Sequence, residues 1–164
     1  MIYSKSAMAA VAGVLAVAAL GSTSQDELTK RLQPRKTEQA VVSKLEEIQN
    51  AAQALDADKV FSFVLENDQG ALVQNGRLFL TRQEALESTK QGFQSLKKVD
   101  YKFTQQRVTL LSSTIALAIG EGTASATTAD GKELTRPFAQ SVVFVLTNGE
   151  WKVFHAHRSS LPAR

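Results

Sequence analysis

Two dipeptides in the C-terminal half, Asp130-Gly131 and Asn148-Gly149, constrain the fold more than any other feature of this sequence. Both are typical of the two-residue turns that join neighbouring antiparallel strands, because both central residues of such a turn take a positive φ. With a further turn at Leu111 to Ser113, the chain from Lys98 onward predicts four strands in succession. The sequence therefore predicts an antiparallel sheet that runs as a meander.

Helical patterns precede this sheet. Apolar residues at spacings of four, three, four and three indicate one face of a long helix: Val41, Leu45, Ile48, Ala52 and Leu55. Asp58 is the expected N-cap of a second, short helix. Thr81-Arg82-Gln83-Glu84 is a capping-box sequence, which predicts a third helix from Arg82 to about Leu96. Between the second and third helices, Asn75-Gly76 predicts a small hairpin of strands Ala71 to Gln74 and Arg77 to Leu80.

Side-chain alternation in the first two long strands predicts their geometry. Val99, Tyr101 and Phe103 hold odd positions but Val108 and Leu110 hold even ones, so a bulge near Gln105 to Arg107 is needed to keep one face inward. The next strand has large residues on one face and small ones on the other, which allows close approach. The large residues are Ile115, Leu117 and Ile119, and the small ones are Ala116, Ala118, Gly120, Gly122, Ala124 and Ala126.

Helices followed by a curved antiparallel sheet that folds around them make an α+β fold. We expect a pocket at the open end of such a sheet. The chain has no cysteine, so disulfides, thiolate metal sites and a thiol nucleophile are excluded.

The N-terminus has the pattern of a secretory signal. Lys5 precedes the uncharged run Ala7 to Leu20, which ends in small residues suited to signal peptidase and is shorter than the roughly 20 residues that span a bilayer. We expect residues 1–21 to be removed on export to a periplasm or to the medium, without stable membrane insertion. Residues 22–36 are then a polar linker and residues 37–164 a single domain. The scattered positive charge lacks the interleaved aromatic residues of a nucleic-acid site, so no nucleic-acid partner is expected.

The final strand carries the best candidates for function. Alternation places Trp151, Val153, His155 and His157 on one face, and Lys152, Phe154, Ala156 and Arg158 on the other. His155 and His157 lie roughly 7 Å apart along the strand, which permits a shared metal with Glu121 as third ligand. The alternatives are hydrogen bonds to neighbouring strands, a subunit interface with Trp151, or a histidine acid or base in a pocket.

Residues 151–159, Trp-Lys-Val-Phe-His-Ala-His-Arg-Ser, followed by Pro162, resemble the closing strand of SnoaL-like domains in the nuclear-transport-factor-2-like superfamily. The resemblance is strongest to the association domain of calcium/calmodulin-dependent protein kinase II, and His-x-His-Arg-Ser is its specific part. It extends upstream through Thr135 and the two hairpin turns, and more loosely to the helix at about residue 37. It implies a cone-shaped curved sheet wrapped around N-terminal helices.

In that association domain the arginine of the run belongs to a pocket for small carboxylates, so the resemblance implies that Arg158 is an anion contact. Two further arginines of that pocket appear here as Val142 and approximately Gly122, which implies a more apolar cavity. Alternation puts Arg158 opposite the two histidines, so only one set can face the cavity unless the strand is bulged, and we favour Arg158 inside.

The ketosteroid isomerases of the same superfamily use a tyrosine, a carboxylate base and a protonated acid. Here their positions correspond to Asn50, to Gln74 or Asn75, and to Ala139 to Ser141, so steroid-type enolisation is not predicted. We expect a module that binds a small, partly apolar molecule. The alternatives are a homodimer or larger homo-oligomer without a ligand, or an isomerase, cyclase or dehydratase. The candidate ligand contacts are Arg158, His155, His157, Trp151, Tyr101 and Glu121, and no metal or cofactor is expected.

Overall fold

The computed structural model describes residues 22–67 and 70–160, with side chains from residue 35 onward. They fall into two compact units divided between Gln33 and Pro34, and helix α1 (Ser22–Gln53) begins in the first. Residues 22–36, expected to form a linker, are helical, because most of them are good helix formers. The other elements belong to the second unit. No helix in the described part of the chain is both long and apolar enough to cross a membrane.

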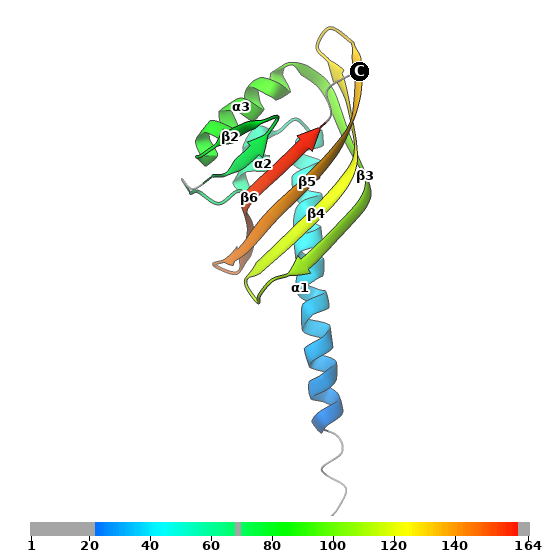
Figure 1. Ribbon diagram of the computed structural model, residues 1–164, viewed down its shortest axis with the longest axis vertical. Coiled ribbons are helices and arrows are strands. Elements are labelled where there is room, and N and C mark those ends of the chain that lie inside the picture. Colours follow the sequence, from blue (N-terminus) through cyan, green and yellow to red (C-terminus); the bar gives the residue numbers. More distant parts are fainter. Residues whose placement is uncertain (1–21, 68–69, 161–164) are drawn as a thin grey trace, which may run out of the picture. The chain divides into compact units, whose positions relative to one another are not determined.

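The second unit has one curved six-stranded sheet, with strand order β2-β1-β6-β5-β4-β3 (Figure 1). The strands are β1 (Leu72–Gln74), β2 (Arg77–Phe79), β3 (Leu96–Leu110), β4 (Ile115–Thr128), β5 (Glu133–Thr147) and β6 (Glu150–Ser160). The other helices are α2 (Ala57–Ser62) and α3 (Arg82–Gln94). Strands β3 to β6 pair antiparallel in chain order, which confirms the predicted meander. Strand β1 pairs parallel with β6, and β3 forms one edge of the sheet.

The helix boundaries differ from the prediction at two places. Helix α1 ends before Leu55, which has a φ of 57° and lies in the turn that follows. The N-cap of α2 is Asp56 rather than Asp58, because the Asp56 carboxylate accepts a hydrogen bond of 2.8 Å from the Lys59 amide. The predicted capping box of α3 is confirmed: Glu84 and Thr81 bond to each other's backbone amides.

The second half of α1 packs on the inner face of the sheet. Val41 and Leu45 lie in one buried cluster with Ala116, Ala118 and Phe144. The small residues of β4 therefore face the helix, as the alternation in this strand predicts. Further along α1, the Gln49 amide donates to the Tyr101 carbonyl oxygen at 2.9 Å and the Gln53 amide donates to the Asp100 carboxylate. These bonds fasten the helix to β3.

Bulges in two strands change which side chains face inward. In β3 the register shifts between Phe103 and Gln105, so Thr104 is unpaired, close to the predicted bulge near Gln105 to Arg107. In β6 the partner of Phe144 is Val153 and that of Val143 is His155, so Phe154 is unpaired. The predicted alternation of β6 is therefore wrong beyond Val153.

The close approach of β3 and β4 gives a stability prediction. A Cβ atom on Gly122 would lie 2.1 Å from the Lys102 carbonyl oxygen and 2.8 Å from Phe103 Cα, both backbone atoms that cannot move aside alone. We expect Gly122→Ala to lower the free energy of unfolding by about 3 kcal/mol, measured by urea denaturation. Gly92→Ala is the matched control, because nothing lies within 4 Å of its Cβ and alanine favours the helix by up to about 1 kcal/mol. Equal effects of the two substitutions would contradict the account of β3 and β4.

Candidate functional site

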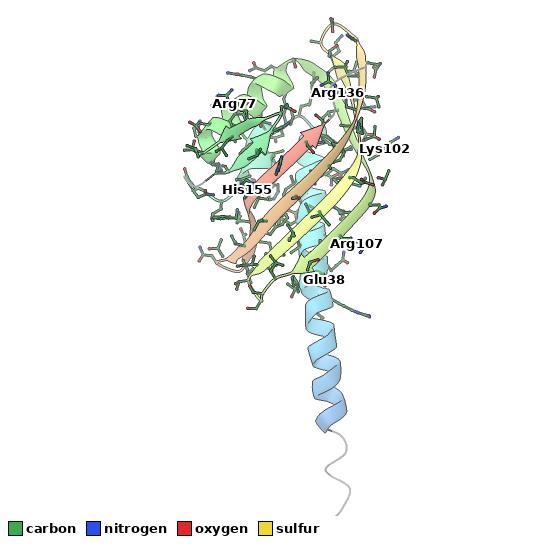
Figure 2. All side chains as sticks on the ribbon, in the orientation of Figure 1. Glu38, Arg77, Lys102, Arg107, Arg136 and His155 are labelled. Carbon is green, nitrogen blue, oxygen red and sulfur yellow. The ribbon has the colours of Figure 1, made fainter. Side chains whose placement is uncertain are left out.

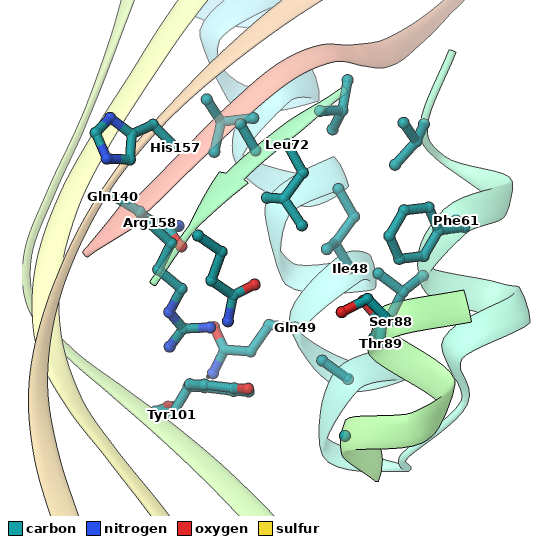
Figure 3. A pocket seen from close by; sticks show the side chains of 18 of the residues that line it. Ile48, Gln49, Phe61, Leu72, Ser88, Thr89, Tyr101, Gln140, His157 and Arg158 are labelled. Atoms are coloured by element: carbon teal, nitrogen blue, oxygen red, sulfur yellow. Dashed lines mark hydrogen bonds between the residues drawn. The ribbon is translucent and has the colours of Figure 1, made fainter. Parts of the chain in front are cut away.

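A pocket of about 750 Å³ lies on the inner face of the sheet, between the strands and the three helices (Figure 3). Apolar side chains from α1, α2, β1 and α3 form much of its wall. They include Ile48, Val60, Phe61, Leu72 and Phe93. A volume of this size accommodates a small organic molecule, and apolar walls are typical of ligand pockets.

Polar side chains line the pocket mainly on the strand side. The sheet contributes Gln74, Arg136, Gln140 and Arg158, and α1 contributes Gln49. Among the described residues, no aspartate or glutamate lines the pocket. The pocket wall therefore carries net positive charge from arginine side chains.

The guanidinium of Arg158, which lines this pocket, lies close to two aromatic rings. Its guanidinium carbon lies 4.3 Å from the centroid of the Tyr101 ring and 4.2 Å from that of Phe138. The two rings are nearly perpendicular, at 84°, with centroids 5.9 Å apart. Within the described part of the chain, Arg158 has no ion pair and its side chain makes no hydrogen bond. The rings hold the guanidinium in place by cation–π attraction and leave its N–H groups free to donate.

The bulge at Phe154 explains why Arg158 reaches the pocket. Because Phe154 is unpaired, the inward alternation of Trp151 and Val153 resumes at Ala156 and Arg158, rather than at His155 and His157. Arg158 therefore shares the inner face with Trp151, whereas the uninterrupted alternation predicted opposite faces.

His155 ties β6 to the segment before β1. Its Nδ1–H donates to the Gly70 carbonyl oxygen at 2.8 Å, and the partner residue Val143 belongs to the outer face of the sheet. The ring is half-buried and does not line the pocket. This arrangement matches the alternative in which an imidazole bonds to a neighbouring segment.

The remaining candidates divide between the pocket and other parts of the fold. Tyr101 lines the pocket, and His157 borders it with an exposed side chain whose ring points away from the Arg158 guanidinium (Figure 3). Glu121 is exposed on β4 and Trp151 is buried in the core cluster, and neither lines the pocket. The described residues hold no group of three or more potential metal-binding side chains, so His155, His157 and Glu121 do not form a shared metal site.

Three further residues at the site were not among the sequence candidates: Gln74 and Gln140 line the pocket, and Phe138 lies against Arg158. Gln74 and Gln140 are the register partners of Arg158 on the two neighbouring strands, and Phe138 is two residues from Gln140 along β5. The parallel pairing of β1 with β6 brings Gln74 to this place, and no local sequence signal reports that pairing. Along β5, Phe138 and Gln140 alternate with exposed residues. This alternation could have indicated that both residues face inward.

Comparison with known families gives one match over most of the chain. Residues 41–164 match the SnoaL-like domain family. No curated protein matches the chain.

Solved structures with the same fold include three with different assignments. A nuclear-transport-factor-2-like superfamily protein from Salmonella enterica shares 14% identity over 80% of this chain and 94% of its own, with a TM-score of 0.72. A protein from Xanthomonas campestris, provisionally named a calcium/calmodulin-dependent protein kinase II association domain, shares 18% identity over 76% of this chain and 87% of its own, with a TM-score of 0.66. Hexachlorocyclohexane dehydrochlorinase LinA-type3 from Novosphingobium barchaimii shares 10% identity over 80% of this chain and 91% of its own, with a TM-score of 0.69. At these identities the likeness shows the fold alone.

The two histidines of β6 give a testable contrast. Replacing His155 with leucine removes the bond to Gly70, so we expect His155→Leu to lower the free energy of unfolding by about 1 kcal/mol. His157→Leu alters an exposed side chain and should change the stability by less than about 0.5 kcal/mol. Urea denaturation of the two variants measures the difference, and a larger loss for His157→Leu would contradict the assignment.

Proposed function

Because this chain belongs to the SnoaL-like domain family, we propose that it binds a small, partly apolar organic molecule on the inner face of its sheet. The observation that supports this proposal most is the pocket of about 750 Å³, with apolar residues toward the helices and uncommitted polar groups on the strands. Arg158 is the proposed anion contact, and Tyr101 lies beside it. His155, Trp151 and Glu121 do not line the pocket and are not part of this proposed contact set.

Binding is favoured over catalysis by the side chains that line the pocket. Proton transfer at neutral pH needs a group such as a carboxylate or a histidine close to the substrate. The described lining residues include no carboxylate, and the ring of His157 is directed away from the Arg158 guanidinium (Figure 3). An isomerase, cyclase or dehydratase activity has the dehydrochlorinase of the same fold in its favour, but the described lining residues offer it no carboxylate as a base.

A second proposed role is self-association through the outer face of the sheet. Ile115 and Ile119 on β4 are exposed at 38% and 45% of their surface. Their register partners include Val145, and Leu117 between them pairs with Val143, so apolar residues of two strands adjoin on this face. A contiguous apolar patch on a soluble domain marks an interaction site. A homodimer would cover it, and this role is compatible with a ligand in the pocket on the opposite face.

We also propose that the domain works outside the cytoplasm. The support is the signal-like sequence of residues 1–21, which lie outside the described residues. Removal of this segment would leave the pocket and the sheet untouched, because both begin after it.

The binding proposal is tested by native mass spectrometry of the chain purified from cells that produce it. We expect a small-molecule mass that is retained in the native spectrum and lost on denaturation. The denatured subunit mass reports removal of residues 1–21 in the same measurement. An empty pocket in protein purified without a dialysis or refolding step would contradict binding.

A blocking variant links that mass to the pocket. Leu72 lines the pocket, whereas its neighbour Val73 does not, so the two side chains lie on opposite faces of β1. We expect Leu72→Trp to abolish the bound mass by filling the cavity and Val73→Trp to retain it. Circular dichroism confirms that both variants fold.

The self-association proposal predicts a charge-sensitive oligomer. We expect Ile119→Glu to shift the protein to monomers in analytical ultracentrifugation, because it places an uncompensated charge within the apolar patch. Leu78→Glu is the matched control, because Leu78 is also exposed, at 55%, but lies on β2 at the far edge of the sheet. A wild-type chain that is monomeric at micromolar concentration would exclude this role.

A further inference from the structure

One polar residue interrupts the apolar face that α1 presents to the pocket. The described part of α1 lines the pocket with Leu45, Ile48, Gln49 and Ala52, of which only Gln49 is polar. Polar groups in such surroundings ordinarily have hydrogen-bond partners. Gln49 has a partner within the described part of the chain for only one end of its amide group.

The contact with β3 determines which end of the amide is paired. Gln49 Nε2 donates to the Tyr101 backbone carbonyl oxygen at 2.9 Å. Because a carbonyl oxygen only accepts hydrogen bonds, the amide end that faces it must be the NH2 group. The other end, Oε1, has no hydrogen-bond partner in the described part of the chain. Among the described residues that are not exposed, no side-chain oxygen or nitrogen is both cut off from solvent and unpaired. Oε1 of the half-buried Gln49 is therefore open to the pocket, as an acceptor of fixed orientation.

Two hydroxyl groups on or next to α3 have their hydrogens committed in the same way. Thr89 Oγ1 donates to the Ala85 carbonyl oxygen at 2.8 Å, and Ser95 Oγ donates to the Gly92 carbonyl oxygen at 2.7 Å. Both Thr89 and Ser95 line the pocket. A hydroxyl has a single hydrogen to donate, so each of the two offers only its lone pairs to a ligand. Figure 3 shows Gln49 and Thr89 at the pocket on different helices, so acceptors are supplied from both.

The amide groups of the strands are less restricted. Gln74 and Gln140 line the pocket, and neither side chain hydrogen-bonds to the described part of the protein. Their amides can rotate to present either an N–H or an oxygen to a ligand. A group that is already fixed loses less conformational freedom on binding than one that must be ordered. Of these three lining glutamines, Gln49 is therefore the one whose role, that of acceptor, is set before a ligand enters.

The charge of the pocket wall restricts the matching donor to a neutral group. Arg77, Arg136 and Arg158 line the pocket, and among the described residues no aspartate or glutamate does. An ammonium group could donate to Gln49, but it would leave water for a wall that holds no counter-charge. A hydroxyl group donates without that cost.

We propose that Gln49 selects the ligand by accepting a hydrogen bond from a hydroxyl group on it. The ligand is then a neutral hydroxyl compound, or a compound with a hydroxyl at one border of its apolar body, and that body lies toward Ile48 and Phe61. A molecule of the same shape without the hydroxyl would displace water from Oε1 and leave this oxygen unpaired, which weakens binding. This inference rests on the proposed binding function and names the class of molecule that the pocket takes.

The test compares three naphthalene probes that differ in one substituent: 2-naphthol, 2-methylnaphthalene and 2-naphthylmethylamine. The methyl group is close to the hydroxyl in size but cannot donate, and the amine is an ammonium at neutral pH. Fluorescence titration of the full chain, freed of any bound molecule, should show about tenfold tighter binding of naphthol than of methylnaphthalene. The ammonium probe should bind more weakly than naphthol.

A matched pair of variants separates a ligand contact from a structural role of Gln49. Gln49→Met keeps the length of the side chain but removes the amide, and should bring the affinity ratio of naphthol to methylnaphthalene to about one. It also removes the bond to Tyr101. Gln53→Met is the control for this loss, because Gln53 donates to Asp100 on the same strand but does not line the pocket. Gln53→Met should leave the affinity ratio unchanged, even where it lowers the stability of the fold.

Each contrary result has a distinct meaning. Equal affinity of the wild-type chain for naphthol and methylnaphthalene overturns the inference and leaves the binding function standing, and so does tighter binding of the ammonium probe than of naphthol. An equal fall of the affinity ratio in Gln49→Met and Gln53→Met assigns the effect to the attachment of α1 to β3, which also overturns the inference. Binding of none of the three probes overturns the proposed binding function together with the inference.

Discussion

The packing of α1 against β4 is the contact from which the rest of the fold follows. Val41 and Leu45 lie in one buried cluster with Ala116 and Ala118, so helix and sheet pack together here. One to two turns later the same face of α1 presents Ile48, Gln49 and Ala52 to the pocket instead. The cavity therefore begins where the close packing ends. Hydrogen bonds from Gln49 and Gln53 to β3 keep the helix and the sheet at a fixed separation there.

The bulge at Phe154 has a comparable effect on the chemistry of the pocket. Without an unpaired residue, strict alternation would place two imidazoles on the inner face and the guanidinium outside. With it, the inner face holds the Arg158 guanidinium. The resemblance in the final strand identified this arginine, and the geometry explains how it reaches the cavity.

The parts of the fold that could be predicted from the sequence are those with a local cause. The turn Asn148-Gly149 and the capping box of Thr81 and Glu84 depend on residues only a few positions apart, and both form as expected. The bulge in β3 was signalled by a switch in the apolar pattern. The bulge in β6 was not signalled in this way. Ala156 is only weakly apolar and stands between two histidines, so the apolar pattern shows no clear switch there. Of the sequence candidates, Tyr101, His157 and Arg158 line the pocket, whereas Gln74 joins them through a parallel pairing with no sequence signature.

The position of β3 has a consequence for how copies of this chain can associate. A long edge strand leaves a row of backbone groups unpaired, which is a template for another strand. Strand β3 carries four exposed basic side chains: Lys97, Lys98, Lys102 and Arg107. Addition of a second copy of this strand at the edge would therefore bring like charges together. Growth of an endless intermolecular sheet is therefore suppressed. In the homodimer proposed above, contact through the outer face would be self-complementary and would close at two copies, which would give a finite assembly rather than a filament.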